Sequence, residues 1–184
     1  MSKRKKSTGK LIKPQIWVFC EGETERAYVD FLRSKYRIPI EVVCHVAGNS
    51  ITEAAINKYK QSKPAHPKDR QFLLYDGDVA AVVDRLKKIK DATLLLSNPC
   101  IELWFLLHFK SQKSAISGKD CIRELKNRTA NGYEKGKLHS KLSKKLNESC
   151  KQACERAKQL KEGDNPSSAL YRFIEMLEFH SSDQ

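Results

Sequence analysis

Three acidic residues follow apolar runs that are typical of buried strands. Glu21 follows the run from Gln15 to Cys20, and Asp76 and Asp78 follow the run from Gln71 to Tyr75. If both runs are parallel strands of one sheet, their carboxyl ends meet at one edge, where ligands bind in such sheets. Carboxylate oxygens suit Mg²⁺ or Mn²⁺, which neutralises developing phosphate charge and can activate water. The spacing therefore predicts a metal site for phosphodiester chemistry at Glu21, Asp76 and Asp78; the alternative is solvated loop residues or acids at helix starts.

Two polar residues interrupt the apolar segment from Cys100 to Phe109. Glu102 needs a partner, a metal or a route to solvent if its segment is buried, although an acid near a helix start is also favoured by the helix dipole. His108 could act as a general acid or contact a phosphate in its charged form. Its alternative interpretation is a hydrogen-bonded packing residue.

The positioning elements are strands that alternate with helices, which indicates an α/β fold with a largely parallel sheet. Four strands are predicted, over residues 15–20, 40–46, 71–75 and 92–96. The intervening helices are predicted over residues 23–36, 50–61, 79–90 and 99–109. Ser50-Ile-Thr-Glu53 matches a capping box, while Asn98 and Pro99 suit the N-cap and the first position of the fourth helix.

The remainder of the chain is predicted to be helical. A short helix is expected over residues 119–128, a long one from about Ser140 to Lys161, and a last one after Asn165-Pro166. In the long helix an apolar stripe leaves many lysines outside it. Four of them are candidate contacts for nucleic-acid phosphates: Lys141, Lys144, Lys145 and Lys151. The alternative for this face is simple solvation.

Charge favours a polyanionic partner. Lys and Arg number 35 against 22 Asp and Glu, a formal net charge of +13, which is typical of proteins that bind nucleic acid, either DNA or RNA. Residues 1–12 are predicted to be a disordered basic arm, because they offer almost nothing to bury. No apolar run approaches the length of a membrane span, and the six cysteines follow no zinc-ligand spacing. We therefore expect a cytoplasmic protein with reduced thiols.

Four segments together carry a resemblance to a known family. They are Cys20-Glu-Gly-Glu-Thr-Glu25 with the following Ala-Tyr-Val-Asp-Phe, then Tyr75-Asp-Gly-Asp78, then the Asn-Pro to His-Phe segment ending at Phe109, and Asn165-Pro-Ser-Ser168. From about Pro14 to Leu177 the chain resembles the RloB family, whose fold is TOPRIM-like. The resemblance implies about four mostly parallel strands flanked by helices, with a helical C-terminal region.

The resemblance also implies functional roles. TOPRIM domains cleave or join nucleic acid strands with a strand-end glutamate and an Asp-x-Asp pair, which correspond to Glu21, Asp76 and Asp78. Glu25, one helical turn later, could supply a second carboxylate, and related nucleases use a later acidic group for which Glu102 is the candidate. RloB-like proteins accompany restriction and abortive-infection defence loci, often beside an ATPase, which implies a role in phage or plasmid defence.

Two functions therefore remain open. The first is a TOPRIM-type nuclease that requires Mg²⁺ or Mn²⁺; the second is a non-catalytic module that binds nucleic acid or an ATPase partner. No Walker loop is present, so an ATP-driven step would need a separate ATPase. We expect one domain over residues 13–184, with an α/β part to about residue 109 and a helical part over about 110–180.

Overall fold

The computed structural model describes residues 14–44, 51–130 and 132–182 of the 184-residue chain. Within these ranges a five-stranded sheet has the order β2-β1-β3-β4-β5. The strands are β1 (Ile16–Cys20), β2 (Ile40–Cys44), β3 (Arg70–Asp76), β4 (Ala92–Asn98) and β5 (Ser167–Ser168). The first four pair in parallel, and β5 adds to β4 in the antiparallel direction. The predicted α/β fold with a mostly parallel sheet is confirmed.

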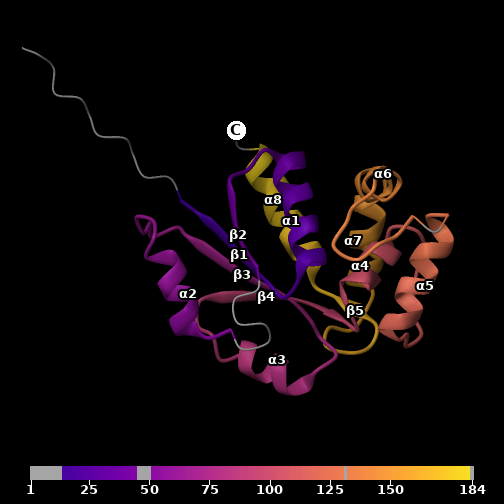
Figure 1. The fold of residues 1–184 in the computed structure, drawn as a ribbon, viewed down its shortest axis with the longest axis horizontal. Coiled ribbons are helices and arrows are strands. Elements are labelled where there is room, and N and C mark those ends of the chain that lie inside the picture. Colours follow the sequence, from indigo (N-terminus) through magenta and orange to yellow (C-terminus); the bar gives the residue numbers. More distant parts are fainter. Residues whose placement is uncertain (1–13, 45–50, 131, 183–184) are drawn as a thin grey trace, which may run out of the picture.

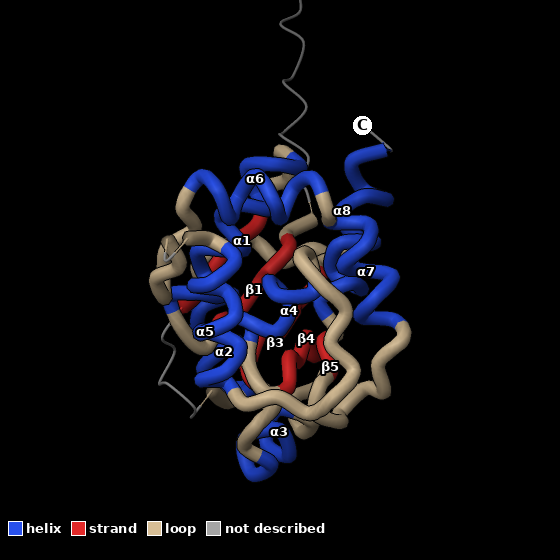
Figure 2. Tube along the Cα trace, turned by 90° about the vertical axis from the view of Figure 1, so that its right-hand side faces the viewer, coloured by secondary structure: helices blue, strands red, loops and turns tan. Residues whose placement is uncertain are grey.

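Eight helices are described, and they cover both faces of the sheet (Figure 1). Their bounds are α1 (Glu23–Tyr36), α2 (Glu53–Lys60), α3 (Ala80–Leu86), α4 (Ile101–Leu107), α5 (Gly118–Arg128), α6 (Ser140–Glu148), α7 (Cys150–Lys158) and α8 (Leu170–Ser182). Helices α2 and α3 lie on one face, and α1, α4, α7 and α8 on the other. In Figure 1, α5 lies farther from the sheet than α4, and Figure 2 shows α6 above α4.

Side chains of β1 alternate between two hydrophobic cores, because successive residues of a strand point to opposite faces. Trp17 and Phe19 pack with residues of α2 and α3. Ile16, Val18 and Cys20 belong to the larger core that α1, α4, α7 and α8 build. This two-sided burial is what a continuously apolar strand predicts.

Helix α4 is buried along its whole length, and it is apolar on all sides except at Glu102. Trp104 fills the space between α4 and α1, and its indole Nε1 donates to the hydroxyl of Tyr28 at 2.7 Å. Both side chains are almost fully buried. This bond therefore joins two helices of the larger core at a place that water does not reach.

The predicted start of the fourth helix was wrong. Asn98 is the last residue of β4, and α4 begins at Ile101 with Cys100 as its N-cap. Ser97 and Asn98 pair with Ser168 and Ser167, so strand pairing with a distant segment extends β4. Local sequence cannot reveal that pairing, since β5 lies about 70 residues later and has only two residues.

The predicted single helix over residues 140–161 was also wrong. It is divided at Ser149, whose φ and ψ of −112° and 19° are not helical. Figure 1 shows α6 end-on and α7 from the side, so the two axes differ in direction. The break lets Leu142 and Leu146 of α6 and Ala153 of α7 enter the same core.

Two predictions concern the edges of the described ranges. The basic arm over residues 1–12 and Ser50 of the predicted capping box lie outside the described residues. Helix α2 is capped by Thr52, whose hydroxyl accepts from the backbone N of Ala55 at 3.2 Å. No helix within the described ranges has the length and apolar character that crossing a bilayer requires.

Replacing Tyr28 with phenylalanine tests the buried bond to Trp104. We expect Tyr28→Phe to lower the free energy of unfolding by about 1–3 kcal/mol, because the indole N–H of Trp104 loses its acceptor. Urea unfolding followed by fluorescence measures the change. Tyr59→Phe, at a 43% exposed tyrosine, is the matched control and should change stability little; equal stability of both variants would contradict the assignment.

Candidate active site

A cavity of about 300 Å³ opens beyond the carboxyl ends of β1 and β3. Residues from α1, α4 and the loop after α5 complete its wall. The lining comprises Glu21, Gly22, Glu23, Thr24, Glu25, Asp76, Glu102, Lys135 and Gly136. Four of the five acidic residues of this lining were singled out from the sequence, namely Glu21, Glu25, Asp76 and Glu102, and the fold brings these four together.

Backbone contacts between β1 and β3 position the first two carboxylates. The backbone N of Glu21 donates to the carbonyl of Leu74 at 3.2 Å, so Glu21 continues the strand pairing. One carboxylate oxygen of Glu21 then accepts from the backbone N of Asp76 at 3.0 Å. The parallel register places these residues side by side, although 55 positions separate them.

Asp76 also holds the start of α4. Its Oδ1 accepts from the backbone N of Ile101 at 3.0 Å. A carboxylate at a helix N-terminus satisfies an otherwise unpaired N–H and interacts favourably with the helix dipole. Asp76 therefore replaces, from another strand, the local cap that Asn98 was predicted to provide.

Glu102 is only 1% exposed, and two residues of the loop after α5 contact it. The hydroxyl of Tyr133 donates to Glu102 Oε1 at 2.7 Å, and Lys135 Nζ lies 3.7 Å from the same oxygen. The loop is tied to α1 because the backbone N of Gly136 donates to the hydroxyl of Thr24 at 2.9 Å. The buried charge that the sequence pointed to therefore has a cation and a hydroxyl as partners.

The carboxylates disfavour one another's ionised forms. Burial raises the pKa of Asp76 to about 8, and the charges of Glu25, Glu21 and Glu102 add to the shift. Burial likewise raises the pKa of Glu25 to about 7, with further contributions from Glu102 and Glu21. The charge of Glu102 also raises the pKa of the Lys135 ammonium group, which favours the charged form of that lysine. Perturbed groups that gather in one cavity are a feature of functional sites.

Gly22 permits the close approach of the strand end to Glu25. A Cβ at this position would lie 3.1 Å from Glu25 Oε2. With any other residue at this position, the Glu25 side chain would have to shift by a few tenths of an ångström. Glycine therefore leaves the Glu25 carboxylate in its place in the cavity wall.

Two of the candidate residues lie elsewhere. Asp78 is exposed in the turn before α3 and does not line the cavity. His108 is 1% exposed, and its Nδ1 lies 2.9 Å from the carbonyl of Trp104. Its Nε2 is buried and has no hydrogen-bond partner among the described residues. Burial of His108 against Trp104 favours a packing role for this residue.

The four candidate lysines lie along α6 and α7. Lys141, Lys144 and Lys151 are exposed, and Lys145 is half-buried. Lys144 Nζ is 3.9 Å from a carboxylate oxygen of Glu148, while Lys145 Nζ lies 5.7 Å from the ring centre of Phe109. The Lys144–Glu148 pair is exposed, and exposed ion pairs of this kind contribute little energy.

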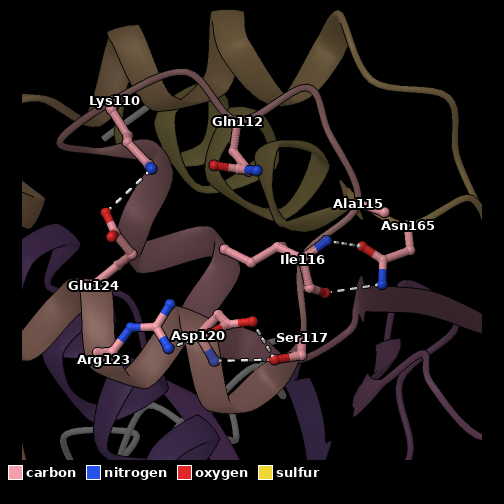
Figure 3. Close-up of a pocket in the computed structure, with 9 residues that line it drawn as sticks. All are labelled: Lys110, Gln112, Ala115, Ile116, Ser117, Asp120, Arg123, Glu124 and Asn165. Atoms are coloured by element: carbon pink, nitrogen blue, oxygen red, sulfur yellow. Dashed lines mark hydrogen bonds and ion pairs between the residues drawn. The ribbon is translucent and has the colours of Figure 1, made fainter.

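A second cavity of about 490 Å³ lies between α5 and the loop that precedes it (Figure 3). The amide of Asn165 bonds both the backbone N and the carbonyl of Ile116, at 3.0 and 2.9 Å. The charged side chains here pair with one another: Lys110 with Glu124 at 3.1 Å and Arg123 with Asp120 at 2.6 Å. Its charge is thus largely neutralised internally, unlike that of the acidic cavity.

Tyr133 and Lys135 were missed from the sequence. They lie in a segment that composition marks only as a Gly-containing loop, and 31 residues separate Tyr133 from Glu102. The one available signal was indirect. A buried Glu102 requires a partner, but nothing local indicates which residue supplies it.

Comparison with known proteins identifies a family. The family model described as RloB-like protein matches residues 16–177. No curated protein and no solved structure matches the chain. The match spans the sheet, the acidic cavity and the helices that cover them.

The raised pKa values predict how stability depends on pH. The pKa of an aspartate in an unfolded chain is about 4, whereas burial raises the pKa of Asp76 in the folded protein to about 8. Between these values the folded state holds the additional proton, so the free energy of unfolding decreases as pH rises. Asp76→Asn cannot lose this proton, and its amide oxygen can still accept from Ile101. We compare the free energy of unfolding of Asp76→Asn with that of the wild type at each pH. We expect this difference to favour the variant by at least about 1 kcal/mol more at pH 8 than at pH 5.

Urea unfolding at both pH values in EDTA measures this difference. Asp84→Asn is the control, because the side chain of Asp84 is 71% exposed. Parallel pH profiles for all three proteins would contradict the assigned environment of Asp76.

Proposed function

Since the chain belongs to the RloB-like protein family, we propose that it is a metal-dependent nuclease whose active site is the cavity lined by Glu21, Glu25, Asp76 and Glu102. The observation that carries this proposal is the convergence of four carboxylates beyond the carboxyl ends of parallel strands. A phosphodiester substrate repels such a cluster, so a cation must accompany it. The TOPRIM-like arrangement and the positive net charge of the chain support the same substrate class.

The donor set suits Mg²⁺ or Mn²⁺, which prefer oxygen ligands. The known hydrogen bonds use one oxygen each of Glu21, Asp76 and Glu102, so the second oxygen of each can serve as a ligand. In the described part of the chain no three His, Cys, Asp or Glu side chains are grouped so that they could hold a metal ion. Binding therefore requires side-chain rotation within the cavity. When bound, the ion would neutralise phosphate charge and lower the pKa of a water ligand.

The protein's own residues supply the remaining chemistry. Glu25, with a pKa of about 7, can exchange a proton near neutral pH and is the candidate general base for the attacking water. Lys135 is 64% exposed at the cavity and carries a positive charge beside Glu102. It can contact a phosphate oxygen of the substrate, while Tyr133 keeps Glu102 in place.

The substrate would extend from this cavity over basic surfaces. Lys141, Lys144 and Lys151 on α6 and α7 are the proposed contacts for backbone phosphates, which are bound without reading sequence. Asp78 remains a predicted metal ligand that would have to approach from the adjacent turn. A role in phage or plasmid defence beside an ATPase is likewise proposed, on the family resemblance alone.

A non-catalytic module is the second candidate. The exposed position of Asp78 and the absence of a grouped metal-binding set among the described residues favour it. Such a module would bind nucleic acid or an ATPase through basic surfaces, and its carboxylates would only cap α4 and order the loop after α5.

Manganese binding tests the first step of the nuclease proposal. We expect the intact protein to bind Mn²⁺ in electron paramagnetic resonance titrations, and more tightly at pH 8 than at pH 6, because Asp76 must lose its proton to become a ligand and ionised Glu25 adds negative charge to the cavity. Asp76→Asn and Glu21→Gln should each weaken binding at least about tenfold. Asp84→Asn should bind like the wild type, and unchanged binding by the two cavity variants would place the ion elsewhere.

Cleavage of labelled single- and double-stranded DNA and RNA tests the activity. We expect cleavage with Mg²⁺ or Mn²⁺, none in EDTA, and a loss of at least about 100-fold in Asp76→Asn and Glu21→Gln, since transition-state charge loses its stabilisation. Asp78→Asn decides whether that residue takes part, and Asp84→Asn is the control. Intact substrates in every condition, despite salt-sensitive binding, would favour the non-catalytic module.

A further inference from the structure

A third cavity, of about 640 Å³, lies at the opposite end of the sheet from the acidic site. The amino ends of β1 and β3 form its floor, since Ile16 pairs with Arg70 in the register. Ile16 and Glu21 are five residues apart along extended chain, a separation of about 16 Å. The two cavities are therefore distinct, and this one is not needed for the proposed nuclease.

The charged residues of this cavity are mainly cationic. Arg37, Lys68 and Arg70 line it together with His180 of α8, and the one carboxylate is that of Asp69. Asp69 already accepts hydrogen bonds from the backbone N of Gln15 at 2.7 Å and of His66 at 3.1 Å. It thereby ties the loop before β3 to the start of β1.

The three permanent cations keep their charge free for a ligand. None of Arg37, Lys68 and Arg70 forms an ion pair with a carboxylate in residues 14–44, 51–130 or 132–182. This differs from the cavity beside α5, whose cations are paired. Guanidinium groups bind phosphate through two parallel hydrogen bonds.

The walls between these cations are apolar. Ile16 and Ile38 are buried side chains of the floor, and three prolines complete the lining. A cavity within the size range of small-molecule sites, about 300–1,000 Å³, with apolar walls and a few polar groups suits an organic ligand better than a bare ion. The charge and the walls together match a phosphate joined to an organic group that can pack on aliphatic side chains.

We propose that this cavity binds an organic phosphate of mononucleotide size, with Arg37, Lys68 and Arg70 contacting the phosphate and the isoleucine and proline wall contacting the base. The ligand would sit at the end of the sheet remote from the acidic cavity. It would therefore bind without occupying the proposed nuclease site.

Calorimetric titration of the full chain with AMP, GMP, CMP and UMP tests the proposal. We expect at least one of them to bind saturably with one site per chain. The corresponding nucleosides and inorganic phosphate should each bind at least about tenfold more weakly. A nucleoside lacks the contacts to the cations, and inorganic phosphate lacks the contacts to the isoleucine and proline wall. No saturable binding of any mononucleotide up to about 5 mM, a limit corresponding to only a few kcal/mol, would overturn the proposal, as would inorganic phosphate binding as tightly as the nucleotide.

Matched variants locate the site. Lys68→Gln and Arg70→Gln should each weaken nucleotide binding about tenfold, as loss of a charge-assisted bond implies. Lys87→Gln is the control. It removes a lysine outside this cavity whose side chain is 63% exposed, and it should leave nucleotide affinity unchanged. Glu21→Gln should also leave binding unchanged; binding that is lost in Glu21→Gln but kept in Lys68→Gln and Arg70→Gln would assign the nucleotide to the acidic cavity and contradict the proposal.

Discussion

The carboxylate of Asp76 is the contact on which the arrangement of the acidic cavity depends. It lies at the end of β3, its backbone N–H is bonded by Glu21 from β1, and its Oδ1 caps α4 at Ile101. Two strands and the most deeply buried helix therefore meet at one acidic residue. Because α4 carries Glu102, the same contact brings a carboxylate from a helix into a cavity otherwise formed by strand ends and α1.

This arrangement is costly for folding by itself. Burial removes hydration from these carboxylates and, together with their mutual repulsion, raises the pKa values of Asp76 and Glu25 to about 8 and about 7. A fold gains nothing in stability from such crowding. Its partial compensation comes from Tyr133 and Lys135, which contact Glu102 from a loop that Thr24 ties down. Unfavourable charge that the fold nevertheless maintains is a reason to assign function to this cavity.

The polarity of the parallel sheet separates two electrostatic environments. Its carboxyl ends carry the acidic cavity, and its amino ends carry the cavity lined by Arg37, Lys68 and Arg70. In a parallel sheet the amino ends of all strands lie at one end of the sheet and their carboxyl ends at the other. Residues that precede the strands are therefore separated from residues that follow them. A strongly basic chain can thus hold a carboxylate cluster without the two kinds of charge cancelling.

The sequence by itself determined the α/β class, the two-sided burial of β1, and the meeting of Glu21 with Asp76, because strand periodicity and the residue after each strand are local properties. It also indicated that Glu102 needed a partner. Tertiary structure alone decided that Tyr133 and Lys135 are those partners, that β5 extends β4 through Asn98, and that α6 and α7 separate at Ser149. It also decided that Asp78 lies outside the cavity that Asp76 lines. Each of these depends on contacts between segments distant in sequence or on the direction of a turn, and neither hydrophobic period nor local propensity encodes them.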